Sequence, residues 1–138
     1  MNTRYFFKLM VTLLTGFVLA LASAAPATGE TVRLVVDYGD GVSKVFKAIP
    51  WTKGMTVEDL LKEAKKTPHG ITYDAKGIGS SFLVKKIDDL VNEGSGADKK
   101  SWQYWVNTEY ADVGAGTKIV QPDDVVTWRF DIYRGAKN

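Results

Sequence analysis

The chain has 138 residues, no cysteine and a single histidine, His69. The lack of cysteine excludes disulfide bonds, thiolate catalysis and a metal held by sulfur. One histidine is too few for a multi-histidine zinc site. Composition therefore excludes a sulfur-ligated metal and a multi-histidine zinc site, and the fold has to be stable through its hydrophobic core alone.

The first 24 residues have the organisation of a secretory signal peptide. Arg4 and Lys8 precede an uncharged stretch from Leu9 to Ala22, and Ala22-Ser23-Ala24 is a small-x-small cleavage pattern. The apolar run is shorter than the about 20 residues of a membrane span, and an uncleaved anchor is the alternative. Cleavage after Ala24 predicts a secreted or periplasmic protein, residues 25–138, without a membrane association once the signal is removed.

The predicted mature chain is electrically neutral. The full sequence has 18 Lys+Arg and 16 Asp+Glu, and Arg4 and Lys8 are lost with the signal segment. A neutral domain lacks the basic surface that attracts nucleic acid, so no nucleic-acid partner is expected. We expect a flexible leader at 25–31, one domain at 32–134 and a tail at 135–138.

The domain begins with a predicted β-hairpin. Val32–Val36 and Val45–Ile49 alternate with strand period, and Gly39-Asp40-Gly41 between them has hairpin-turn chemistry. Asp37 and Asp40 also suggest calcium ligands, but the loop lacks the further carboxylates of a calcium site. The hairpin is therefore the preferred interpretation.

One helix is predicted, at about residues 56–66. Thr56 is a natural N-cap, and Glu58 and Asp59 lie in the first turn, where the helix dipole favours acidic side chains. Apolar residues recur on one face, and Pro68 and Gly70 stop the helix. That face is formed by Val57, Leu60, Leu61 and Ala64.

The rest of the domain is predicted to be short strands and loops. The predicted strands are Ile71–Asp74, Phe82–Ile87, Ser101–Asn107, Lys118–Val120 and Val125–Tyr133. A hairpin, one helix and then strands predict an α+β fold, a β-grasp-like mixed sheet with the first hairpin and last strand sharing its centre. One helix cannot cover both faces of such a sheet, so one face is left for solvent, a ligand or a partner.

Ordered motifs over about residues 32–133 resemble a known family. They are "GMTVEDLLKEAKKTPHGITYDAKGIGSSFLVKKIDDL", then "WQYWVN" and "PDDVVTWRF". Together they resemble the C-terminal β domain of transcobalamin and intrinsic factor, and the small secreted bacterial domains grouped with it. The resemblance implies a β-grasp-like fold and one wall of a cobalamin site, whose other wall is a large helical domain in the vitamin carriers. Cobalamin or another corrinoid is then a candidate ligand at a half-site, although no bound cofactor is expected. His69 is interpreted as an exposed loop residue and not as a cobalt ligand.

The strand from Ser101 to Asn107 carries aromatic side chains on both faces. Trp102, Tyr104 and Val106 share one face, and Gln103, Trp105 and Asn107 share the other. In the simpler interpretation, Trp105 only covers the far side of the sheet. In the functional one, Trp105 between two amides is a platform for a planar or sugar-like ligand.

Binding candidates follow from this strand and from the resemblance. The resemblance places Phe82, Trp105 and Tyr110 at the ligand-facing edge, and Gln103 and Asn107 flank the Trp105 ring. Trp102 and Trp128 are expected in the core, whereas Trp51 fits a rim residue or a lid over the helix start equally well.

No motif indicates an enzyme. A G-x-S-x-G nucleophile motif is absent, Gly77-Ile78-Gly79 lacks a phosphate-loop context, and the Asp pairs have no helper base nearby. The sequence predicts a secreted, non-catalytic binding module for a small molecule. The alternative is a structural or protein–protein interaction module at the cell surface or in the periplasm.

Overall fold

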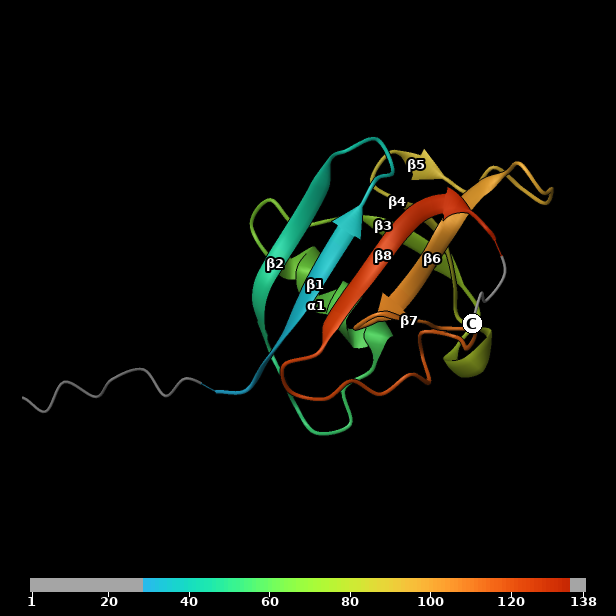
Figure 1. The fold of residues 1–138 in the computed structure, drawn as a ribbon. Coiled ribbons are helices and arrows are strands. Elements are labelled where there is room, and N and C mark those ends of the chain that lie inside the picture. Colours follow the sequence, from blue (N-terminus) through green and yellow to red (C-terminus); the bar gives the residue numbers. More distant parts are fainter. Residues whose placement is uncertain (1–28, 135–138) are drawn as a thin grey trace, which may run out of the picture.

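The computed structural model describes residues 29–134 (Figure 1). The predicted signal peptide, most of the predicted leader and the tail at 135–138 lie outside the described residues. In chain order the elements are β1 (Thr31–Asp37), β2 (Ser43–Pro50), α1 (Val57–Lys66), β3 (Tyr73–Lys76), η1 (Gly79–Ser81), β4 (Leu83–Ile87), β5 (Leu90–Val91), β6 (Lys100–Val106), β7 (Glu109–Tyr110) and β8 (Val125–Ile132). Within residues 29–134, no helix is long and apolar enough to cross a membrane.

A five-stranded sheet in the order β2-β1-β8-β6-β7 forms the larger part of the domain. The last strand, β8, lies at its centre, parallel to β1 and antiparallel to β6. The fold is therefore a mixed, sheet-dominated α+β fold, and the predicted neighbourhood of the first hairpin and the last strand is confirmed. The predicted extended piece at Lys118–Val120 contributes only an isolated bridge between Thr56 and Ile119.

The prediction of a single mixed sheet is wrong, because β3, β4 and β5 form a separate three-stranded sheet. The predicted strand at Ile71–Asp74 begins two residues later, at Tyr73. β5 has only two residues, and its pairing with β4 joins Lys86 to Val91 and Ile87 to Leu90. Such short strands carry too little alternation to reveal which sheet they join.

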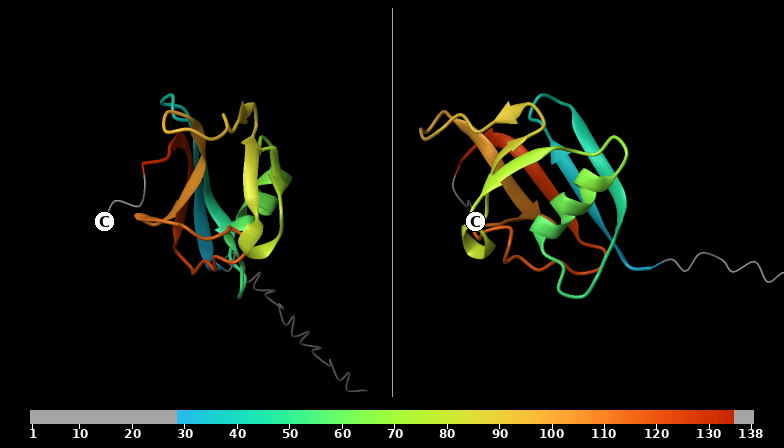
Figure 2. Two further views of the ribbon diagram at one scale, coloured as in Figure 1. Left: turned by 90° about the vertical axis from the view of Figure 1, so that its right-hand side faces the viewer. Right: turned by 180° about the vertical axis from the view of Figure 1, so that it is seen from behind.

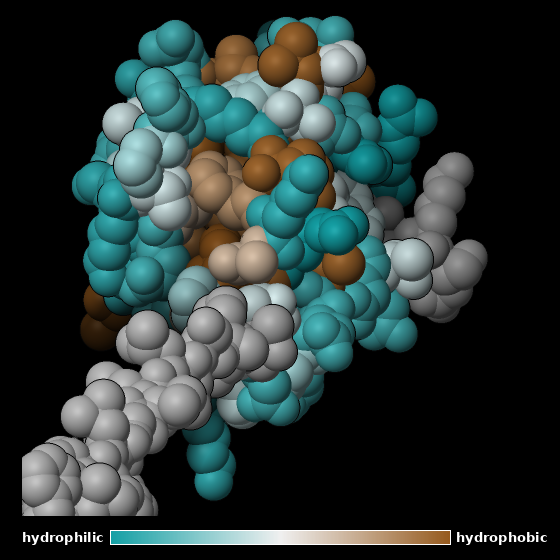
Figure 3. Space-filling model, turned by 90° about the vertical axis from the view of Figure 1, so that its left-hand side faces the viewer, coloured by the Kyte–Doolittle hydropathy of each residue, from teal (hydrophilic) through white to brown (hydrophobic). Residues whose placement is uncertain are grey.

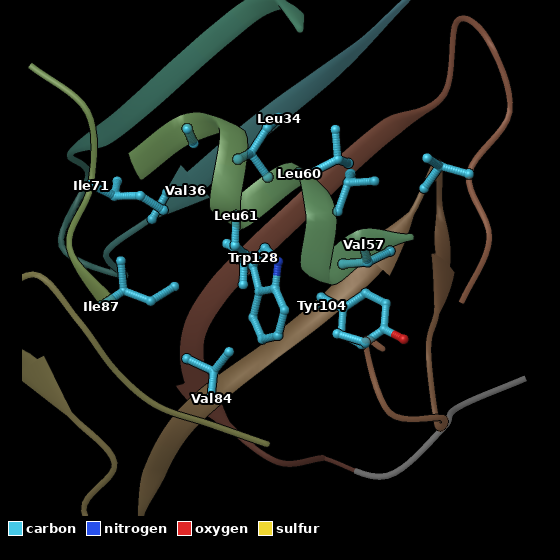
Figure 4. Close-up of a cluster of buried hydrophobic side chains, with 14 of the residues drawn as sticks. Leu34, Val36, Val57, Leu60, Leu61, Ile71, Val84, Ile87, Tyr104 and Trp128 are labelled. Atoms are coloured by element: carbon cyan, nitrogen blue, oxygen red, sulfur yellow. The ribbon is translucent and has the colours of Figure 1, made fainter. Parts of the chain in front are cut away.

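The two sheets and the helix form two layers (Figure 2). The five-stranded sheet is one layer, and α1 with the three-stranded sheet is the other, so both cover the same face. Between them, Leu60 and Leu61 of α1 meet Trp128 of β8, with Val84 of β4 beside them (Figure 4). The opposite face of the large sheet has no covering layer among the described residues, as the single helix predicts.

The helix begins where the sequence predicts. Thr56 is the N-cap, and its hydroxyl accepts a hydrogen bond from the amide of Asp59, while the Asp59 carboxylate accepts one from the amide of Thr56. This reciprocal pair satisfies two amides that the first turn leaves without a helical partner. Burial opposes the ionised form of Asp59, but the hydrogen bonds from Thr56 and the nearby Lys62 outweigh it and lower the pKa of Asp59.

Strand β2 is an edge of the large sheet and is protected as edge strands usually are. It carries Lys44 and Lys47 and ends at Pro50, and the register of its pairing with β1 shifts between Val32 and Leu34. Charges, proline and bulges discourage another strand from pairing there. The side of the molecule that carries β2 shows apolar side chains gathered within hydrophilic borders (Figure 3).

Asp88 joins the two layers at one end of the molecule. Its carboxylate accepts hydrogen bonds from the Tyr38 hydroxyl at 2.5 Å, the Thr72 amide at 2.8 Å and the Lys44 ammonium group at 3.0 Å. Tyr38 and Lys44 belong to the β1–β2 hairpin, whereas Thr72 precedes β3. Burial raises the pKa of Asp88, but these hydrogen bonds outweigh it, so the net pKa is lowered.

We predict that Asp88→Asn lowers the free energy of unfolding by about 1–3 kcal/mol at neutral pH, because charge-assisted hydrogen bonds become neutral ones. The lowered pKa means that the ionised carboxylate stabilises the fold above its unfolded pKa of about 3.9. This stabilisation is lost as the pH falls through the lower, folded-state pKa. Urea unfolding at neutral pH and at about pH 2 measures both effects.

Asp89→Asn is the matched control, because Asp89 is adjacent and exposed. It is expected to change stability by less than about 0.5 kcal/mol. The assigned role of the Asp88 carboxylate would be contradicted if Asp88→Asn and Asp89→Asn lost the same free energy of unfolding. It would also be contradicted if the loss in Asp88→Asn were as large at low pH as at neutral pH.

Candidate ligand-binding surface

Strand β6 sends its aromatic side chains to both faces of the large sheet, as its alternation predicts. Trp102, Tyr104 and Val106 are buried at 4%, 5% and 8% exposure, whereas Trp105 lies half-buried on the face that no layer covers. Trp105 is therefore exposed enough to contact a ligand while its backbone is held by β8 on one side and β7 on the other.

Three aromatic rings, Trp105, Tyr110 and Tyr133, form a chain of contacts on the open face. Tyr110 of β7 meets the Trp105 ring edge-on with 5.4 Å between centroids, and Tyr133 lies 5.9 Å from Tyr110. We call Trp105, Tyr110, Tyr133 and Arg129 the aromatic face. Burial, followed by the neighbouring Tyr133 and Asp112, raises the pKa of Tyr110, so its hydroxyl stays protonated near neutral pH.

Arg129 of β8 is the charged member of this surface. Its guanidinium carbon lies 5.2 Å from the centre of the Trp105 ring, within the range of a cation–π interaction. Its Nε donates to the Asp37 carboxylate at 2.9 Å. The guanidinium is thus held beside Trp105 by two contacts, and its Nε is used by Asp37.

A shallow hollow of about 280 Å³ lies over the aromatic face. It is lined by Gln103, Trp105, Thr108, Tyr110, Arg129, Asp131, Ile132 and Arg134. Gln103 is only 9% exposed, and its side-chain NH₂ donates to the Asp131 carbonyl at 2.8 Å. The Gln103 amide is therefore fixed in place at the base of the hollow.

Asn107, the second amide expected beside Trp105, lies in the two-residue turn between β6 and β7. Its φ is +57°, a left-handed conformation that Asn tolerates better than most residues. Its side chain donates to the Asp124 carboxylate and accepts from the Val125 amide, each at 3.0 Å. These bonds tie the turn to the start of β8 and occupy the Asn107 amide.

Phe82 is not part of the aromatic face. It lines a different cavity of about 310 Å³, between β6 and the η1–β4 segment, where Tyr104 and Trp128 also lie. The structure therefore brings Gln103, Trp105 and Tyr110 together and separates Phe82 from the Trp105 ring. The sequence predicts one ligand-facing edge, whereas the structure divides its residues between two hollows.

The other tryptophans lie where their roles predict. Trp102 and Trp128 are buried in the core at 4% and 3% exposure. Trp51 is half-buried, and its indole nitrogen donates to the Val120 carbonyl at 2.9 Å. This bond favours the interpretation of Trp51 as a lid over the helix start rather than as a rim residue of a binding site. His69 is exposed in the loop after the helix, as predicted.

Arg129, Arg134 and Tyr133 were not among the predicted site residues. Along β8, Arg129 lies on the other face of the strand from Val126, Trp128 and Phe130. The sequence alone therefore predicts that its side chain points away from the core. Its position beside Trp105 could not be predicted, because that depends on the register of Gln103 with Arg129 and of Trp105 with Thr127.

The sequence model of a protein family described as "Domain of unknown function (DUF4430)" matches residues 54–131. The chain belongs to this family. The match runs from just before α1 into β8, so it contains most of the aromatic face but not the β1–β2 hairpin. No curated protein matches the DUF4430 chain in sequence.

A solved structure shares the fold of this DUF4430 chain. It is a crystal structure of a protein from Ruminococcus gnavus ATCC 29149 described as a "putative metal binding protein", with 13% sequence identity and a TM-score of 0.58. The likeness covers 75% of this chain and 98% of the other. At this identity it establishes a shared fold. Within residues 29–134, no three His, Cys, Asp or Glu side chains group to hold a metal ion.

We predict that Asn107→Ala lowers the free energy of unfolding by about 2–3 kcal/mol. The substitution removes two side-chain hydrogen bonds and places alanine in a left-handed conformation. Thermal or urea unfolding measures the effect. Thr108→Ala, at the next and equally exposed turn position, should stay within about 0.5 kcal/mol of the parent protein. Equal losses in the two variants would show that the Asn107 side chain does not hold the turn.

Proposed function

We propose that this DUF4430 protein is a non-catalytic binding module that holds a planar small molecule on the aromatic face. The observation that carries the proposal is the half-buried Trp105 ring, which lies in a hollow between the Tyr110 edge and the Arg129 guanidinium. An aromatic ring and a guanidinium both offer flat surfaces for stacking at a low cost in side-chain entropy.

The polar groups of the hollow favour a ligand with hydrogen-bond acceptors at its edge. Arg129 and Arg134 bring ten N–H donors between them by the chemistry of the guanidinium group, of which the Arg129 Nε is used by Asp37. Carbonyl, carboxylate or phosphate oxygens on a planar ligand would accept from the rest. The Tyr110 hydroxyl also lines the hollow and, because burial raises its pKa further above neutral pH, it stays protonated and can donate a further hydrogen bond to such oxygens.

Corrinoids are the ligand class that the resemblance to the C-terminal domain of transcobalamin suggests. A corrin ring also suits the aromatic face, because it is large and flat and carries amide oxygens around its edge. A hollow of about 280 Å³ holds only part of such a ligand. Small-molecule sites usually bury 70–90% of their ligand, so this surface supports weak binding by itself. We therefore propose a half-site, closed in the functional state by a second protein surface.

A protein-interaction module is the second candidate, because the open face also carries a flat stripe. Val45, Val35, Thr127, Trp105 and Tyr110 lie opposite one another on five neighbouring strands. Val45 is 48% exposed at the end of the stripe that is far from the hollow. A protein partner would use the whole stripe, whereas a small ligand would use only the end around Trp105.

Titration of the protein with cobinamide, followed by tryptophan fluorescence corrected for corrinoid absorption, tests the proposal. We expect saturable quenching, with affinity at least about tenfold weaker in Trp105→Ala, because stacking on one aromatic ring contributes about 1–3 kcal/mol. Trp51→Phe is the matched control, since Trp51 is also half-buried but bonds to Val120 away from the hollow.

Val45→Lys separates the two candidates. It should leave cobinamide affinity unchanged, while it would weaken a protein partner that covers the stripe. Absence of saturable quenching up to about millimolar corrinoid, near −4 kcal/mol, would reject the corrinoid half-site. Quenching that is equal in Trp105→Ala and the parent protein would move the binding site away from the aromatic face.

We also propose that the protein acts outside the cytoplasm, in the periplasm or as a secreted protein, after cleavage behind Ala24. The charged start, the uncharged stretch and the Ala22-Ser23-Ala24 pattern support this. N-terminal sequencing of protein recovered from cell fractions should give Ala25 as the first residue, in the periplasmic or external fraction. Intact Met1 in the membrane fraction would instead support an uncleaved anchor.

A further inference from the structure

A second cavity, of about 310 Å³, lies between the two layers, on the opposite side of β6 from the Trp105 ring. We call it the interlayer cavity. Five aromatic residues line it, together with parts of the η1–β4 segment and residues 111–115. The aromatic residues are Phe82, Trp102, Tyr104, Tyr110 and Trp128. It is within the size range of small-molecule sites, and its lining combines aromatic rings with polar groups.

Strand β6 offers two backbone groups on this side. The amide of Asn107 donates to the Val125 carbonyl, and bonds between antiparallel strands recur at every second residue. The amide and carbonyl groups of Trp102 and Tyr104 therefore point away from β8. Asn92 accepts from the Trp102 amide, and the Ala111 amide donates to the Tyr104 carbonyl. The Trp102 carbonyl and the Tyr104 amide form no hydrogen bond with another of residues 29–134.

The Trp128 ring also borders this cavity. Its indole Nε1 is buried and has no hydrogen-bond partner in the described part of the chain, and the residue is 3% exposed. Figure 4 shows its ring between Leu61 of α1, Tyr104 of β6 and Val84 of β4, with the nitrogen on the side of α1. The ring therefore contributes apolar surface to the cavity, and its indole N–H signal reports on a ligand that packs beside it.

Both ends of the β6 edge are closed around the cavity, which limits the ligand to a compact molecule. Asn92 bridges the Trp102 amide and the Val84 carbonyl at one end, at 2.8 and 2.9 Å. At the other end, the Tyr104 hydroxyl donates to the Val113 carbonyl at 2.7 Å. A Cβ atom on Gly114 would lie 2.2 Å from the Ser80 carbonyl oxygen, so the loop and η1 are packed backbone to backbone. An extended peptide could not run past these closures.

We infer that the interlayer cavity is a separate binding site for a small aromatic molecule that carries an amide group. Its ring packs against Phe82 and Tyr104, its carbonyl oxygen accepts from the Tyr104 amide, and its N–H donates to the Trp102 carbonyl. A neighbouring carbonyl and amide on one strand edge are the complement of an amide group, as in strand pairing. Gln103 and Tyr110 line both hollows, but the binding groups differ, because the aromatic face uses Trp105 and Arg129.

Nicotinamide is a suitable probe, because it combines an aromatic ring with a primary amide. Protein produced from the full chain and labelled with ¹⁵N shows separate indole N–H signals for its tryptophans, assigned through contacts to neighbouring protons. We expect nicotinamide to shift the Trp128 indole signal through the ring current of its aromatic ring and to move the Tyr104 amide signal downfield, saturably and with one dissociation constant. The signals of Trp51 and Trp102 should stay in place, since their indole nitrogens already donate to Val120 and Leu90.

Phe82→Ala and Phe46→Ala are the matched variants, since both rings are half-buried against the core but only Phe82 lines the interlayer cavity. Nicotinamide affinity should fall by about tenfold in Phe82→Ala and stay unchanged in Phe46→Ala. N,N-dimethylnicotinamide, which lacks the N–H donor, should also bind about tenfold more weakly.

Three results would overturn the inference. The first is a Trp128 indole signal that does not move up to the solubility limit of nicotinamide. The second is a saturable shift that is the same in Phe82→Ala and the parent protein. The third is a saturable shift of the Trp105 signal alone, which would place nicotinamide on the aromatic face. Because cobinamide binding is read at Trp105 and nicotinamide binding at Trp128, either site can fail without affecting the test of the other.

Discussion

The fold depends on the position of β8, the last strand, between strands from the two ends of the domain. It pairs in parallel with β1 and antiparallel with β6, so the large sheet cannot close until the whole chain is present. Pairings this distant in sequence are costly in chain entropy and have to be offset by burial. Val126, Trp128 and Phe130 provide that burial on one face of β8. The same strand sets the register that places Arg129 beside Trp105 on the other face.

Local patterns in the sequence were sufficient for the elements with clear periodicity. The helix, its Thr56 cap and the two faces of β6 follow from spacing alone, because each depends on residues within one or two turns or strands. The division into two sheets could not be predicted in this way. Tyr73–Lys76 and Leu90–Val91 are too short to show a pattern, and their place is decided by packing against α1 and by Asp88. Asp88 and Asn107 both have a left-handed backbone, in the two-residue turns between β4 and β5 and between β6 and β7.

The candidate site was predictable only in its central residue. Trp105 had to face away from Trp102 and Tyr104 whichever sheet contained the strand. Its neighbours were not predictable, since the contact with Arg129 depends on the β6–β8 register and the Tyr110 contact on the two-residue strand β7. Phe82 was expected near Trp105, but it lies on the other side of β6. The β6 side chain that faces Phe82 there is Tyr104, not Trp105. One strand thus separates two hollows with different chemistry.

The unpaired groups behind β6 are more consistent with binding than with packing alone. A buried donor left without a partner costs about 1–3 kcal/mol, a large share of a typical total stability of about 5–15 kcal/mol. The fold pairs the neighbouring edge groups of β6 through Asn92 and Ala111, so it has the means to satisfy this edge. The Trp102 carbonyl and the Tyr104 amide are left between these two closures, and a ligand in the interlayer cavity would pair both of them.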